Sequence, residues 1–147
     1  MRTSYQHKQF GGISLLASVI GILVVLLLVS QLGSQPLLLV LLALLVFVAV
    51  SCSSLTVIVT PSSLVFWFGP GVLRKTIALR EVEGVEPVRN PWYYGIGLRV
   101  TPRGMLYNVS GLSAVEITRR DGTRLRLGTD EPERLTAALR QALSRFE

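Results

Sequence analysis

The chain has 147 residues, of which 50% are hydrophobic and only 16% charged, and its formal net charge is +6. An ordinary soluble domain is about one quarter charged, so we exclude a soluble single domain, a disordered tail and a disulfide-rich secreted scaffold. The shortage of charge is local, because no Asp, Glu, Lys or Arg occurs between Lys8 and Arg74. The composition therefore predicts a membrane segment followed by one small domain.

Two uncharged apolar runs cover residues 10–32 and 37–54. Each is long enough to cross a hydrocarbon core of about 30 Å as a helix. Gly33 and Pro36 supply a turn between them. The first run is longer than that of a signal peptide and lacks a small-residue cleavage site, so we expect an uncleaved anchor. The sequence thus predicts a two-helix transmembrane hairpin over residues 10–54, preceded by a short tail of residues 1–9.

The distribution of basic residues predicts the orientation of this hairpin. Arg2 and Lys8 precede the first helix, the hairpin loop contains neither Lys nor Arg, and all the other basic residues follow the second helix. By the positive-inside rule, the N-terminal tail and the C-terminal domain are both expected to be cytoplasmic. Neither span holds an ionisable residue, which argues against a channel or transporter that acts alone.

After Leu55 the hydrophobic pattern becomes that of β-strands. Short strands are predicted by their composition and by the Pro and Gly breaks between them, at residues 55–60, 64–68, 74–78, 96–101 and 105–109. For residues 81–88 the apolar spacing suits a helical turn or an irregular strand, and the two alternatives stay open. The domain is therefore expected to consist mostly of short strands.

A further β-hairpin can be predicted with its register. Residues on the same face of paired strands must oppose one another, so Ile117 should face Leu125 and Glu116 should face Arg126. This register leaves residues 120–122 as the loop, with Gly122 in the left-handed conformation. We expect the Glu116–Arg126 ion pair to be exposed and to contribute under about 1 kcal/mol.

The chain is predicted to end in an amphipathic helix. Asp130 is a suitable N-cap and Glu133 completes a pattern like a capping box. An apolar stripe then runs at helical spacing from Leu135 to Phe146. Such a stripe must be buried, and the open end of a curved sheet is the expected partner.

The order of about seven strands and one capping helix resembles the bacterial pleckstrin-homology-like (PH-like) domain, which occurs beside a transmembrane hairpin in small bacterial membrane proteins. The resemblance covers residues 55–147 and rests on turn and packing residues, in the segments 64–69, 77–79, 85–95, 120–122 and 127–130. It implies an α+β, mostly-β barrel and a multi-pass protein of the inner (cytoplasmic) membrane. A fold of this kind hosts unrelated functions.

The residues that most enzymes need are scarce. His7 is the only histidine and Cys52 the only cysteine, and neither a nucleophile motif nor a phosphate-binding loop is present. We therefore expect no enzyme activity, no cofactor, no metal site and no small-molecule substrate. The arginines at positions 119–126 are interrupted by Asp121 and match no nucleic-acid recognition motif, so no nucleic-acid partner is expected.

Basic and aromatic residues provide the candidate surface. Cations near a bilayer are attracted to anionic lipid, and Trp and Tyr favour the headgroup layer. The same side chains also suit a protein partner. The candidate lipid or partner surface consists of Arg74, Lys75, Arg89, Trp92, Tyr93 and Tyr94. The resemblance does not extend to phosphoinositide binding, because residues 61–63 lack the basic side chains that eukaryotic PH domains use there.

Two classes of function follow from these observations. In the first, the cytoplasmic domain is a non-catalytic interaction module that binds a partner protein or a second copy of the chain. In the alternative class, it is a peripheral module that senses anionic lipids. A further alternative is an accessory subunit whose spans complete a larger membrane complex.

Overall fold

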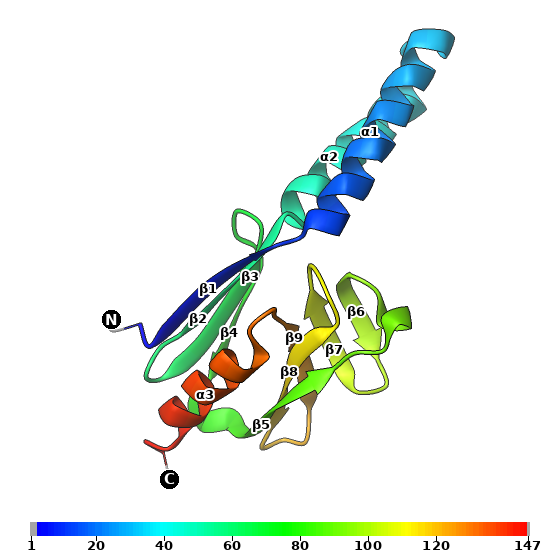
Figure 1. Cartoon of the computed structure of the whole chain (residues 1–147). Coiled ribbons are helices and arrows are strands. Elements are labelled where there is room, and N and C mark those ends of the chain that lie inside the picture. The colour runs from blue at the N-terminus through cyan, green and yellow to red at the C-terminus, as the bar shows by residue number, and fades with distance from the viewer. Residues whose placement is uncertain (1–2, 147) are drawn as a thin grey trace.

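A computed structural model of the chain describes residues 3–146. Figure 1 shows a pair of helices standing apart from two packed β-sheets, with the C-terminal helix against one side. In chain order the elements are β1 (Tyr5–Phe10), α1 (Gly12–Leu32), α2 (Pro36–Ser51), β2 (Ser54–Val59), β3 (Ser63–Phe68), β4 (Val72–Ala78), the 3-10 turn η1 (Leu79–Glu81), β5 (Val82–Arg89), the 3-10 turn η2 (Trp92–Tyr94), β6 (Gly97–Thr101), β7 (Gly104–Asn108), β8 (Ser113–Arg119), β9 (Arg124–Gly128) and α3 (Pro132–Leu143).

The two apolar helices lie side by side and expose most of their large apolar side chains. By length and composition α1 is able to cross a membrane, and a signal sequence near the N-terminus passes the same test. With 16 residues, α2 is shorter. The helices begin and end within a few residues of the predicted limits. The outer limits differ because Phe10 and Ser54, which were predicted as helix ends, pair with each other as strand residues. A Cβ atom on Gly21 would lie 3.4 Å from Leu45, so this small residue serves the packing of α1 on α2.

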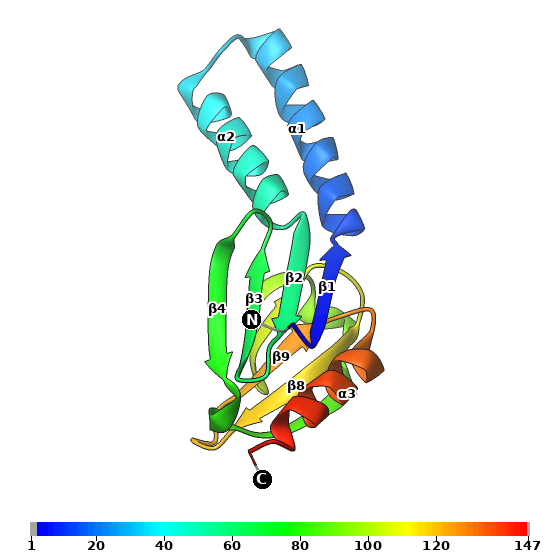
Figure 2. The same ribbon diagram turned by 90° about the vertical axis from the view of Figure 1, so that its left-hand side faces the viewer.

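Strand β1 was not expected, since residues 1–9 were predicted as a tail. It pairs antiparallel with β2, from Tyr5 opposite Val59 to Phe10 opposite Ser54. Only Gly11 separates β1 from α1, and only Cys52 and Ser53 separate α2 from β2. Figure 2 shows that the two helices continue directly into these neighbouring strands. The helical hairpin is therefore held to the domain by a paired strand at each of its ends.

The first sheet has the order β1-β2-β3-β4, and its inner face is apolar in the middle and carries polar residues on each of its two edge strands. One row across this face runs from His7 through Val57 and Phe66 to Lys75. Val57 and Phe66 are buried in the core. His7 and Lys75 each reach a polar side chain outside this sheet.

The second sheet has the order β5-β8-β9-β7-β6, with β7 and β9 parallel. The predicted register of the β8–β9 hairpin is confirmed, since Ile117 pairs with Leu125 and Glu116 with Arg126. Gly122 has a φ of 86°, as the predicted turn requires. Residues 81–88, which the sequence left open, lie at the end of η1 and in β5. The region after the hairpin contains strands β2 to β9, one more than the number expected.

Helix α3 closes the side of the two-sheet core next to β5 and β8. Leu135 and Leu139 are fully buried there, as the amphipathic stripe predicted. The predicted N-cap, Asp130, is wrong. The N-cap residue is Glu131, and no side chain makes a capping hydrogen bond to the helix. Asp130 faces β1 instead, where it meets His7. The stripe also ends earlier than expected, with Phe146 exposed beyond the last helical residue.

Candidate functional site

The predicted surface residues fall into two groups on different sheets. Arg74 and Lys75 lie on β4, an edge strand of the first sheet. The Arg74 guanidinium is 5.0 Å from the centre of the Trp67 ring, and Lys75 Nζ donates a hydrogen bond of 3.1 Å to the Tyr107 hydroxyl. The other four residues lie at the end of β5 and in η2, at the second sheet. The structure thus does not bring Arg74 and Lys75 together with the aromatic residues in a direct contact.

The aromatic residues belong to a connection between β5 and β6 that we call the aromatic turn, residues 90–95. Trp92 is 80% exposed and Tyr93 is 68% exposed. Trp92 packs edge-on against Tyr93 with ring centres 5.9 Å apart, and Tyr93 packs in the same way on Tyr94 at 5.3 Å. The turn therefore presents two large aromatic side chains on the surface.

A buried ion pair holds this turn in place. Glu116 is 3% exposed and Arg126 is 8% exposed, and Arg126 Nε donates to Glu116 Oε2 at 2.9 Å. Arg126 Nη1 donates to Asn90 Oδ1, also at 2.9 Å. The Arg126 guanidinium lies 6.0 Å from the centre of the Tyr94 ring. The expectation of an exposed pair is wrong, because the alternation of β8 and β9 identifies the outer face of the sheet but not the turn that covers it.

Backbone and amide contacts fix both ends of the turn. The Asn90 backbone N–H donates to the Leu112 carbonyl at 2.7 Å. The Asn108 side chain donates to the Gly95 carbonyl at 3.5 Å and to the Gly111 carbonyl at 2.9 Å. These contacts tie the turn to the loop between β7 and β8.

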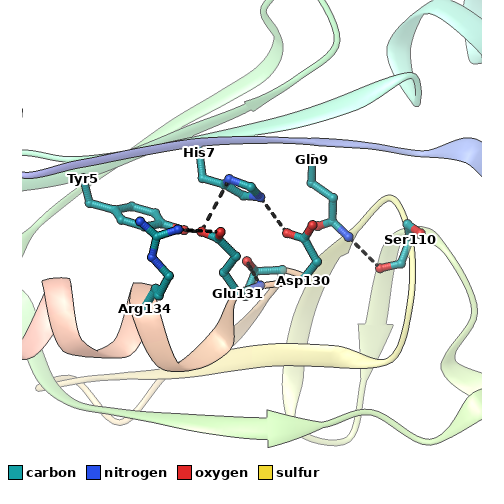
Figure 3. Close-up of polar contacts among 8 residues, drawn as sticks. Tyr5, His7, Gln9, Ser110, Asp130, Glu131 and Arg134 are labelled. Carbon is teal, nitrogen blue, oxygen red and sulfur yellow. Dashed lines mark hydrogen bonds and ion pairs between the residues drawn. The ribbon is translucent and has the colours of Figure 1, made fainter.

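A second polar cluster lies between β1 and the residues that precede α3, as Figure 3 shows. His7 Nε2 is 2.6 Å from Asp130 Oδ1, and His7 Nδ1 is 3.5 Å from Glu131 Oε2. The Tyr5 hydroxyl donates to Glu131 Oε2 at 3.1 Å. Gln9 donates through its side-chain amide to the Ser110 carbonyl at 3.1 Å. The polar inner face of β1 is thus docked on the C-terminal part of the chain.

The electrostatics of this cluster favour an uncharged tyrosine. Burial raises the pKa of the Tyr5 hydroxyl, and the hydrogen bond to the Glu131 carboxylate raises it further. The Arg134 guanidinium in turn donates to Glu131 at 2.7 Å. Within residues 3–146, no group of His, Cys, Asp and Glu side chains has the geometry of a metal site. The sequence gives no signal for the cluster, because more than 120 residues separate Tyr5 from Glu131.

A third feature is a shallow hollow of about 370 Å³. The β8–β9 turn, which forms part of its lining, lies at the end of the domain farthest from the helices (Figure 1). Its lining residues come from η1 and the β8–β9 turn and are Arg80, Glu81, Arg119, Arg120 and Asp121. Arg119 Nε is buried there without a hydrogen-bond partner. Hydrogen bonds from the Thr123 hydroxyl and backbone N–H lower the pKa of Asp121. We call this feature the distal hollow.

Comparison with known proteins adds nothing to these observations. No protein-family model matches the chain, and no curated protein is significantly similar to it in sequence. The resemblance to PH-like domains therefore enters below only as a proposal.

Proposed function

We propose that the chain is an integral membrane protein of the bacterial inner membrane, with both α1 and α2 as spans. In this proposal its PH-like domain is cytoplasmic and acts as a non-catalytic protein-interaction module. The observation that carries the proposal is the continuity of α1 with β1 and of α2 with β2. Because both helices run into paired neighbouring strands, the domain is fixed relative to the hairpin instead of hanging from a flexible linker.

A domain fixed in this way presents the same end to the cytoplasm at all times. That end carries the distal hollow, which combines three arginines with two acidic residues. Arginine forms bidentate hydrogen bonds to carboxylates, and the Arg80 and Arg120 side chains that line the hollow are exposed. The hollow is therefore the part of the domain best suited to an acidic side chain of a partner protein.

The experiment is site-specific photo-crosslinking of the full-length chain in the membrane of a bacterial host. A photoreactive residue replaces Arg120 in the hollow, and the matched control replaces Thr76, which is exposed on β4. We expect a discrete protein adduct at position 120 that is lost in the Arg119→Glu background. An adduct of twice the chain's mass would identify the partner as a second copy.

The result that contradicts the proposal is equally concrete. Position 120 would then give no more protein adduct than position 76, although the chain is present in the membrane fraction. A chain absent from the membrane fraction would refute the proposed spans themselves.

A further inference from the structure

The aromatic turn combines high exposure with a costly anchor. Removing a carboxylate and a guanidinium from water is expensive, and a buried pair seldom repays that cost in stability. Here the buried Glu116–Arg126 pair also reaches Asn90 and the ring of Tyr94. It thereby fixes a turn whose outermost side chains, Trp92 and Tyr93, are left in solvent. The two exposed aromatic side chains are therefore held in a fixed position, as a binding surface requires.

The segment that contains this turn carries positive charge only, although Glu86 is exposed further back on β5. Residues 87–115 include no Asp or Glu, and their basic residues are Arg89, Arg99 and Arg103. Arg99 packs along the turn, with its Nε donating to the Ile96 carbonyl at 3.3 Å. Arg89 is exposed at the end of β5, next to Asn90. An anionic partner is therefore favoured over a neutral or basic one.

The position of the turn relative to the helical hairpin indicates that this anionic partner is the membrane. Figure 1 shows the helical hairpin leaning toward the side of the domain where β6 and the aromatic turn lie. A bilayer around α1 and α2 would thus come nearest to the domain on this side. Neighbouring β6 adds exposed apolar side chains, with Val100 84% exposed and Leu98 also on the surface. Together with the aromatic turn, these side chains form one patch of exposed aromatic and apolar residues between positions 92 and 100.

We propose that the aromatic turn inserts Trp92 and Tyr93 into the headgroup layer of the bilayer that holds the hairpin, with Arg89 and Arg99 facing anionic lipids. The proposal rests on the proposed function, because it requires α1 and α2 to be spans. Tryptophan and tyrosine side chains prefer this layer. Each nearby arginine gains attraction from anionic lipid. The contact fixes how the domain stands on the membrane, so that the distal hollow points away from it.

A second copy of the chain is a poorer occupant of the same surface. Two copies could pair their β6 strands antiparallel, with Leu98 of one copy opposite Val100 of the other. Arg99 of one copy would then lie directly opposite Arg99 of the other. Like charges directly opposite each other destabilise paired strands. The charge of the patch thus opposes self-pairing and favours an anionic bilayer.

The test uses the full-length chain in lipid nanodiscs made of phosphatidylcholine alone or with phosphatidylglycerol. Trp67→Phe leaves Trp92 as the only tryptophan. We expect Trp92 emission to shift to shorter wavelength, to lose acrylamide quenching and to be quenched by lipids brominated near the headgroup. The matched control carries Trp67→Phe, Trp92→Phe and Arg145→Trp. Its tryptophan, at an exposed position just beyond α3, should stay fully open to acrylamide.

The arginines are tested by their dependence on lipid charge. Arg89→Gln with Arg99→Gln should weaken the preference of the turn for anionic over neutral discs on the order of tenfold. Arg145→Gln, at an exposed position just beyond the end of α3, should leave that preference unchanged.

Three results would overturn the proposal. If Trp92 is as open to acrylamide as the tryptophan of the Arg145→Trp control, in discs that contain the chain, the inference is refuted and the proposed spans are not. Protection of Trp92 that vanishes in discs holding one chain assigns the surface to a second copy. A chain that fails to enter discs refutes the proposed spans and this inference together.

Discussion

The aromatic turn and strand β1 are both fastened to the domain by polar side chains, but in different surroundings. The turn is held by Glu116 and Arg126, which are almost completely buried. Strand β1 is held by Tyr5 and His7, whose partners Asp130 and Glu131 remain in contact with water. Solvent weakens the second set of contacts. The comparison teaches that the turn is firmly anchored on the second sheet, whereas the contacts that dock β1, the strand that leads into α1, on Asp130 and Glu131 are weaker.

Breaking the buried pair should have the largest effect. Glu116→Gln leaves the Arg126 guanidinium buried without its counter-charge, and the expected loss in free energy of unfolding is about 3–5 kcal/mol. The measurement is chemical unfolding of the full-length chain in detergent. The control is the double variant Glu116→Leu with Arg126→Met, which should lose much less because no charge remains buried. A loss under about 1 kcal/mol for Glu116→Gln alone would show that water reaches Arg126.

The junction between β1 and α1 should be the next most sensitive position. A Cβ atom on Gly11 would lie 2.6 Å from the Cys52 carbonyl oxygen and 2.9 Å from that of Val109. Both contacts are with backbone, so Gly11→Ala should cost about 1–3 kcal/mol in the same unfolding assay. Gly12→Ala is the matched control, because a Cβ atom there meets nothing within 4 Å. Equal stability of the two variants would mean that the junction adapts freely.

The parts of the fold that the sequence predicted are those set by local patterns. The β8–β9 register follows from alternation and Gly122, and the buried face of α3 follows from the spacing of its leucines. Strand β1 escaped prediction because its inner side chains are polar and its partner β2 lies beyond the whole helical hairpin. Contacts at such a separation leave no trace in local composition.

The candidate surface was predictable only in part for the same reason. Trp92 and Tyr93 attract attention as neighbouring aromatics beside Arg89. The burial of Glu116 could not be foreseen, because it depends on residues 90–95 folding back over β8 and β9. The distal hollow likewise joins residues from η1 and the β8–β9 turn that are distant in sequence.

Removing His7 should loosen β1 with a smaller cost than either change above. His7→Ala deletes the contacts with Asp130 and Glu131, and we expect a loss of about 1 kcal/mol. Gln6→Ala, on the exposed side of the same strand, should change stability by under about 0.5 kcal/mol. Amide hydrogen exchange would localise the effect, with faster exchange in β1 and unchanged exchange in β8. Faster exchange throughout the domain would contradict the weak, local docking of this strand.

The smallest expected effect is that of Tyr5, and it depends on pH. Tyr5→Phe removes the hydrogen bond to Glu131 and should cost about 1 kcal/mol or less at neutral pH. Burial and the Glu131 carboxylate raise the pKa of the folded Tyr5 above its ordinary value of 10.0. The unfolded chain therefore loses the proton first, and the contribution of Tyr5 is complete below pH of about 10 and declines as the pH rises beyond it. The measurement is the free energy of unfolding of the native chain and of the Tyr5→Phe variant across this pH range. The difference in favour of the native chain should decrease as the pH rises. A constant advantage would mean that Tyr5 ionises equally in the folded and unfolded states, and hence that β1 does not bury its hydroxyl against α3.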